Sequence, residues 1–226
     1  MKTVFITGGT GYIGTRLICL LLQRGYRVIA FVRPGSEHKV PPGSEIVTGN
    51  PFDPDSLLPA VPRDGTFVQL LGAPHPSPRK REQFYQIDLP SVRASAEAAG
   101  KAGASHFVYV SVAQEPTNIM KDYQRVRAEG ERLVRETGLP YTFIRPWYVL
   151  GPGHWWPLLL WPVYKILEWI PATRQKATAL GLVTIRQMLN VLLLAIEQRE
   201  HTGVIMDVTA IRHAKAGAEA QPVLLF

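Results

Sequence analysis

Glycines near the start of the chain are spaced in a way that suits phosphate binding. Residues 8–14 read Gly-Gly-Thr-Gly-Tyr-Ile-Gly, which satisfies both G-x-G-x-x-G and G-x-x-G-x-x-G. A β-rich run precedes them at 3–7, a helix-like run follows at 11–24, and a second β-rich run lies at 27–32. In that setting glycines permit a tight turn, let backbone N–H groups approach a pyrophosphate and let the helix pack closely on the strand. The pattern therefore predicts a dinucleotide site. The cofactor is expected to contact Gly8, Thr10, Gly11, Tyr12, Ile13 and Gly14.

The residue after the second predicted strand bears on which dinucleotide is bound. Sites that prefer NAD usually carry Asp or Glu there, which accepts hydrogen bonds from the adenosine ribose. Here that place holds Arg33. A carboxylate would repel a 2′-phosphate, whereas a guanidinium can bind it through two hydrogen bonds. NADP(H) is therefore predicted in preference to NAD(H).

Short β-rich runs alternate with helix-like runs along the chain, which is typical of parallel strands joined by helical crossovers. The predicted fold class is α/β, a Rossmann-type doubly wound parallel sheet. Beyond the first βαβ unit, strands are expected at 45–47, 66–71, 106–111 and 141–144, and helices at 53–60, 79–102 and 119–137.

The composition shifts towards Trp, Pro and Leu after residue 146. We therefore expect a nucleotide-binding domain over 1–146, a small substrate-side region packed on it over 147–210, and a tail over 211–226. The aromatic run 147–156 favours either an apolar substrate pocket or large side chains packed in a core. The run 158–168 has the pattern of an amphipathic helix.

Bulk properties narrow the classes of function. The chain has 226 residues, 46% of them hydrophobic, and a net charge of +7, but only residues 79–81 form a tight basic cluster and no nucleic-acid motif is present. No signal peptide is visible, and the apolar run 155–170 is interrupted by prolines and charges, so a cytoplasmic protein without a transmembrane segment is expected. No Cys, His and carboxylate cluster has metal-ligand spacing, so no metal is expected. The expected partner is a small-molecule substrate, and the oligomeric state stays open.

Several stretches together resemble the atypical short-chain dehydrogenase/reductases, the NAD(P)H-binding group related to extended epimerases and NmrA-like proteins. The stretches are 6–14, 107–111, 123–131 and 141–146. The resemblance implies that Ser111 hydrogen-bonds the substrate oxygen and that Tyr123 is the acid/base. It also implies a lysine four residues after the tyrosine, where this chain has Arg127.

Arginine at position 127 leaves two hypotheses open. A guanidinium supplies a permanent positive charge and can hold the nicotinamide ribose, but it cannot relay a proton as lysine does. The first hypothesis is an NADP-dependent oxidoreductase or isomerase that uses Ser111, Tyr123 and Arg127. The second is a redox sensor or accessory protein that binds NADP(H) without turnover and signals through a partner. Independently of these, Tyr123 and Arg127 could equally belong to an exposed, mostly charged helix face.

The resemblance also implies further cofactor contacts. Asn50 stands where many relatives have an acidic residue that meets the adenine amino group. Leu71 and Gly72, after the fourth strand, would lie beside the adenosine or pyrophosphate. Pro146, after the sixth strand, would face the nicotinamide, and Ser111 and Arg127 would contact the cofactor as well as the substrate.

Overall fold

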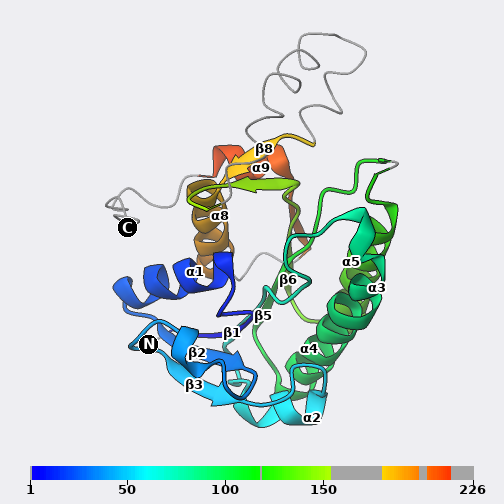
Figure 1. The fold of residues 1–226 in the computed structure, drawn as a ribbon. Helices are drawn as coiled ribbons and strands as arrows, with labels where there is room; N and C mark the ends of the chain where they lie inside the picture. Colours follow the sequence, from blue (N-terminus) through cyan, green and yellow to red (C-terminus); the bar gives the residue numbers. More distant parts are fainter. Residues whose placement is uncertain (1, 118, 154–179, 199–202, 215–226) are drawn as a thin grey trace.

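The computed structural model describes residues 2–117, 119–153, 180–198 and 203–214. Within these ranges the main sheet has seven strands, all parallel, in the order β3-β2-β1-β4-β5-β6-β9 (Figure 1). The strands are β1 (Thr3–Thr7), β2 (Arg27–Val32), β3 (Glu45–Thr48), β4 (Thr66–Gln69), β5 (His106–Val110), β6 (Tyr141–Ile144) and β9 (Val204–Met206). The winding reverses between β1 and β4, and ligands of open α/β sheets bind at the carboxyl edge of such a switch point. The predicted fold class is confirmed.

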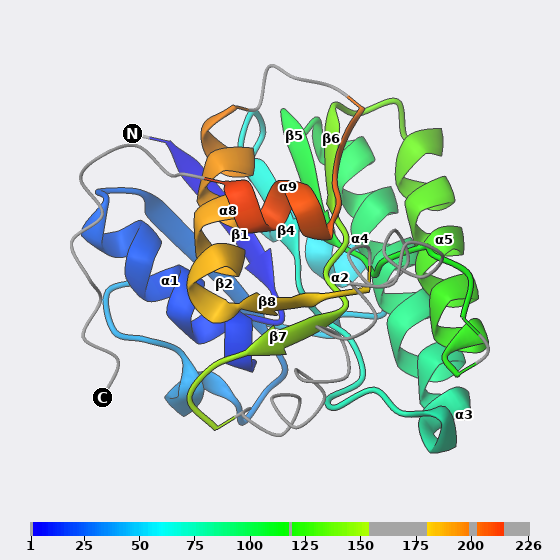
Figure 2. The same cartoon turned by 90° about the horizontal axis from the view of Figure 1, so that it is seen from above.

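Helices cover both faces of this sheet (Figures 1 and 2). One face carries α1 (Tyr12–Gln23) and α8 (Ile185–Glu197), and the other carries α2 (Pro54–Leu57), α4 (Leu89–Ala102) and α5 (Lys121–Glu136). The short elements are η1 (Glu37–Lys39), η2 (Leu58–Ala60), η3 (Pro78–Lys80), α3 (Arg81–Gln83), η4 (Phe84–Asp88) and α9 (Val208–His213).

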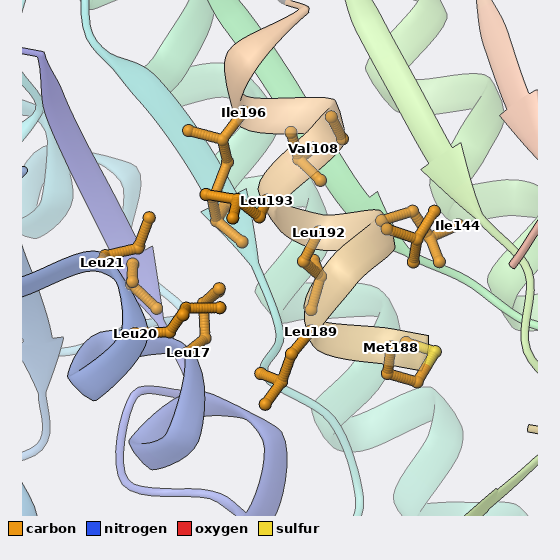
Figure 3. Close-up of a cluster of buried hydrophobic side chains, with 14 of the residues drawn as sticks. Leu17, Leu20, Leu21, Val108, Ile144, Met188, Leu189, Leu192, Leu193 and Ile196 are labelled. Carbon is orange, nitrogen blue, oxygen red and sulfur yellow. The ribbon is translucent and has the colours of Figure 1, made fainter. Parts of the chain in front are cut away.

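Alternation along the strands produces two different core layers, because successive strand side chains point to opposite faces. The layer beneath α1 and α8 is mainly aliphatic. Figure 3 shows leucines of α1 beside leucines of α8, with Val108 and Ile144 across α8 from the α1 leucines. The opposite layer is rich in aromatic rings, with Phe67 and Phe107 stacked at 4.9 Å. That layer includes Tyr109 on β5, which is fully buried and faces the α4 and α5 side of the sheet.

Part of the segment expected to form a substrate-side region lies in the main sheet. Helix α8 packs its apolar face on the sheet, and β9 pairs with β6 as the edge strand. In the same segment, β7 (Tyr148–Leu150) and β8 (Leu182–Thr184) form a separate two-stranded parallel sheet. Helix α9 extends into the expected tail, where Ile211 is fully buried. The substrate-side role of the segment stays a prediction.

The expected helix 79–102 is broken into several pieces. Pro90 has no N–H to donate to a preceding carbonyl, so it fits only in the first turn of a helix. The structure places it there in α4, and the chain before it widens into the π-helical turn η4. This turn carries Asp88, a buried acidic residue that the sequence did not single out.

Within the described ranges, no helix combines the length and the apolar character needed to cross a membrane. The same part of the chain contains no group of three or more His, Cys, Asp or Glu side chains placed to hold a metal ion.

Candidate functional site

The glycine turn connects β1 to α1 at the carboxyl edge of the sheet. Gly8 has a φ of +75°, and a Cβ there would lie 2.6 Å from the backbone nitrogen of Leu71. A Cβ at Gly14 would overlap the carbonyl oxygen of Gly8 and the backbone of Gly9. The turn is closed by a 3.0 Å hydrogen bond from the Gly11 N–H to the Gly8 carbonyl. Glycine is therefore required at position 8 by both space and conformation, and at position 14 by space.

The amino end of α1 fits a phosphate group. Gly11 is the N-cap residue, its backbone is extended, and no side chain caps the helix there. The first N–H groups of a helix have no partner inside the helix and carry a partial positive charge. Thr10 and Ile13, beside these amides, are both partly exposed, as a surface that takes a ligand requires. The free helix amides are the groups that a pyrophosphate would need, and the contacts themselves stay a prediction.

Tyr12 also packs towards the two-stranded sheet. A Cβ at Gly151 would overlap the Tyr12 hydroxyl, and the Arg16 guanidinium lies 4.1 Å from the centre of the Tyr12 ring. Burial raises the pKa of Tyr12, and Arg16 partly offsets this. Tyr12 therefore links the glycine turn to the segment that follows β7.

Two residues expected to contact the adenosine are exposed. Arg33 directly follows β2, the strand next to β1, and its side chain is in solvent. Asn50 follows β3, and its Oδ1 accepts a 3.1 Å hydrogen bond from the Phe52 N–H. Because a carbonyl oxygen has two lone pairs, this local bond still leaves Asn50 able to accept another hydrogen bond.

The loop after β4 packs closely against Arg127. A Cβ at Gly72 would overlap Nη2 of Arg127, and the Ala73 N–H donates a 2.9 Å hydrogen bond to Oδ2 of Asp88. Leu71, just before this pair, is partly exposed and lies against Gly8. The loop predicted to line the cofactor site therefore contacts both the glycine turn and Arg127.

Arg127 is buried and makes three polar contacts. Its Nη2 lies 2.6 Å from Oδ1 of Asp88, and its Nη1 donates to the Tyr109 hydroxyl at 3.3 Å and to the Val110 carbonyl at 3.1 Å. The side chains of Arg127 and Asp88 are 6% and 0% exposed. Arg127 therefore does not belong to an exposed charged helix face, and its charge is compensated by a carboxylate.

Tyr123 lies one turn before Arg127 on α5. The Arg127 guanidinium is 5.1 Å from the centre of the Tyr123 ring, and the Phe84 ring is 4.8 Å from it. Burial raises the pKa of the Tyr123 phenol; Arg127 lowers that pKa, Asp88 raises it, and burial dominates. The phenol is therefore protonated at neutral pH.

Ser111 directly follows β5, and its hydroxyl is buried. Among the residues that the structure describes, Ser111 Oγ has no hydrogen-bond partner. The Ser111 N–H donates a 2.8 Å hydrogen bond to the Ile144 carbonyl. The Ala113 N–H donates a 3.0 Å hydrogen bond to the carbonyl of Pro146, which is buried. A buried hydroxyl without a partner costs free energy, so a ligand that pairs with it would be favoured.

Two polar residues that the sequence analysis did not select support this edge of the sheet. Gln124 donates hydrogen bonds to the carbonyls of Ala113 at 2.7 Å and Glu115 at 2.6 Å, and Asp88 holds Arg127 and Ala73. Gln124 could have been selected from the sequence because it is adjacent to Tyr123. Asp88 could not, because the residues that it contacts come from other segments of the chain.

The expected aromatic pocket is described only in part. Trp147 packs against two apolar clusters, one beneath α8 and one that contains Ala73 and Phe84 and also contacts Tyr123. His154 and the remaining aromatic run, together with the amphipathic helix expected at 158–168, lie outside the described residues.

The switch point and the glycine turn define a dinucleotide-binding domain of the Rossmann class. Residues 8–151 match the NAD(P)H-binding family, and the chain belongs to this family, in the atypical short-chain dehydrogenase/reductase group. The predicted family is thus confirmed.

Individual relatives are named for different activities. The chain is 33% identical to a ceramide reductase of Caulobacter vibrioides over 154 residues, which are 66% of this chain and 47% of that protein. It is 26% identical to photosystem II assembly factor Ycf39 of Cyanophora paradoxa over 145 residues, 63% of this chain and 44% of that protein. The matches thus span less than half the length of both curated relatives.

Solved structures share the fold. MoeE5 in complex with UDP-glucose and NAD has a TM-score of 0.66 at 18% identity, covering 92% of this chain and 79% of that one. This likeness supports the architecture.

Proposed function

We propose that this chain is an NADP(H)-dependent oxidoreductase that reduces a carbonyl group of a small apolar substrate. The observation that carries the proposal is that two residues shortly after Tyr123 on α5 are hydrogen-bonded to the segment around Ser111. Arg127 bonds the Val110 carbonyl, just before Ser111, and Gln124 bonds the Ala113 carbonyl, just after it. Tyr123 and Ser111 are therefore held at the same edge of the sheet, where the cofactor would bind.

The protonation state of Tyr123 favours the direction of reduction. When bound, NADPH would supply a hydride for the carbonyl carbon. The protonated phenol would donate its proton to the carbonyl oxygen, and the Ser111 hydroxyl would hydrogen-bond the same oxygen. Arg127 would stabilise the phenolate that is left, and solvent would return the proton. The isomerase alternative would require Tyr123 to act as a base as well, which its raised pKa disfavours.

Preference for NADP(H) rests on Arg33. This side chain is exposed beside the adenosine end of the expected site, and the structure records no ion pair for it within the described ranges. A 2′-phosphate would therefore meet a guanidinium that is not already neutralised. The apolar character proposed for the substrate is supported by the partly exposed Trp147, which contacts the cluster around Tyr123.

Calorimetric titration with NADPH and NADH tests the cofactor. Wild type is expected to bind NADPH at least tenfold more tightly, and Arg33→Asp to lose that preference, since a bidentate contact to phosphate is replaced by repulsion. Arg93→Asp, the same charge change on the exposed face of α4, should keep it. Equal affinities in wild type would refute NADP(H) preference, and no binding of either nucleotide would refute the proposed function.

The Arg127–Asp88 ion pair favours a second candidate function, that of a non-catalytic accessory protein. Because Arg127 already has a buried partner, the chain could bind NADP(H) and act through a partner protein without turnover. A panel of apolar ketones and aldehydes, assayed by NADPH consumption, separates the two functions. Turnover with any of them supports the reductase, and its absence together with tight NADPH binding supports the accessory role.

A further inference from the structure

Asp88 is a buried carboxylate to which neither the sequence nor the family match assigns a role. Its side chain is fully buried, and it ends the π-helical turn η4 before α4. Its two oxygens serve different segments. Oδ1 lies 2.6 Å from Nη2 of Arg127 on α5, and Oδ2 accepts a 2.9 Å hydrogen bond from the Ala73 N–H in the loop after β4.

The backbone at Asp88 is itself held in place. Its carbonyl accepts a 2.9 Å hydrogen bond from the Ser91 hydroxyl, which in turn accepts a 3.1 Å bond from Gln69 on β4. Gln69 is also hydrogen-bonded to Thr7, the last residue of β1. A continuous buried chain of hydrogen bonds therefore connects the end of β1, next to the glycine turn, to the backbone carbonyl of Asp88.

We propose that Asp88 is a positioning residue whose carboxylate compensates the charge of Arg127 beside Tyr123 and anchors the Gly72–Ala73 loop. Gly72 supports this role because its backbone packs on the Arg127–Asp88 pair without room for a side chain. An effect of Asp88 on catalysis rests on the proposed function, whereas its compensation of the Arg127 charge does not.

Among the residues that the structure describes, three charged or titratable groups interact with Tyr123. They are Arg127 on α5, Asp88 at the end of η4 and Tyr109 on β5, and the cluster that Tyr123 packs against, which includes Phe84 and Met120, is apolar. Asp88 raises the pKa of Tyr123 and Arg127 lowers it. Removal of the carboxylate therefore leaves the cation uncompensated and should make the phenol more acidic.

The test is a pH titration of tyrosine side chains by NMR with ring-labelled tyrosine. Comparison with Tyr123→Phe assigns the Tyr123 signal. In Asp88→Asn the pKa of Tyr123 is expected to shift downwards, while the amide oxygen can still accept the Ala73 hydrogen bond. Asp122→Asn is the matched control, because Asp122 is adjacent to Tyr123 in sequence but pairs with Arg81 and Tyr85 at the surface. It should leave the pKa unchanged.

A folded Asp88→Asn with an unaltered Tyr123 pKa would overturn the proposal. If that variant does not fold, Arg127→Gln and the double variant Asp88→Asn/Arg127→Gln carry the test. In Arg127→Gln the Asp88 carboxylate remains near Tyr123 without its cationic partner, so the double variant, which lacks that carboxylate, should have the lower Tyr123 pKa. Equal values in the two would again overturn the proposal.

An activity measurement then separates this proposal from the proposed function. If the chain is a reductase, the pH profile of alcohol oxidation in Asp88→Asn should reach its plateau at lower pH than in wild type. A shifted Tyr123 titration without turnover in wild type would support the role of Asp88 and refute the reductase. An unshifted Tyr123 titration together with turnover in wild type would support the reductase and refute the role of Asp88.

Discussion

Arg127 and Asp88 form a buried ion pair with 2.6 Å between Nη2 and Oδ1. The family resemblance implies a lysine at position 127 that serves the reacting tyrosine. In this chain the guanidinium still faces the Tyr123 ring, but a carboxylate compensates it. The neighbourhood of Tyr123 therefore favours a phenol that gives a proton over one that takes a proton.

Replacement of Tyr123 by Phe should separate chemistry from binding. The ring would keep its contacts with Phe84, so NADPH affinity should change less than about threefold. Loss of the proton donor should lower turnover by about 10²-fold or more, which is the usual contribution of general acid catalysis. Steady-state rates and calorimetry on the same preparation measure both effects. Undiminished turnover would exclude Tyr123 as the acid.

Gly14→Ala should strongly weaken cofactor binding. The added methyl group would overlap the backbone of the glycine turn, which must move away from the phosphate position. NADPH affinity is expected to fall more than tenfold by calorimetry. Gly100→Ala on α4 is the control, because its methyl group would meet only Thr137 at 3.6 Å. Retained affinity in Gly14→Ala would mean that this turn does not hold the pyrophosphate.

A second buried ion pair stabilises the joint between α5 and β6. Glu131 is almost fully buried and binds Arg145 through two hydrogen bonds, of 2.8 Å and 2.6 Å. Glu131→Gln should lower the free energy of unfolding by about 2 kcal/mol, because the partly buried Arg145 guanidinium loses its counter-charge. Urea denaturation measures the loss. Glu129→Gln, which breaks a surface pair with Arg132 on the same helix, should have a much smaller effect.

Stability should fall at alkaline pH because of Tyr109. Burial raises the pKa of this phenol to about 12, with Arg127 partly offsetting the rise. Between pH 10 and 12 the unfolded chain has lost this proton while the folded chain keeps it, so rising pH favours unfolding. Across these two pH units the free energy of unfolding should fall by roughly 2 to 3 kcal/mol.

Urea denaturation at several pH values, on wild type and Tyr109→Phe, measures this dependence. Tyr109→Phe should lose less stability between pH 10 and 12, because it lacks the phenol whose pKa is raised in the folded protein. Parallel pH profiles for the two proteins would show that Tyr109 is not responsible.

The sequence by itself determined the features that depend on neighbouring residues. The glycine turn, the first βαβ unit and the α/β class follow from local spacing and from the alternation of strands and helices, and the structure and the family match confirm them. Helix α8 is not among the predicted helices. Its sequence does carry a local pattern for one, because Thr184 and Gln187 form a capping box before a periodic apolar run.

Only the tertiary structure decided which distant residues meet. Asp88, Ala73 and Arg127 lie on three segments, and no sequence spacing shows that one carboxylate contacts the other two. The broken helix before α4 likewise depends on a π-helical turn that local propensity does not predict. Burial is a property of the packed chain, so the charge state around Tyr123 could be read only after the strands and helices had been placed.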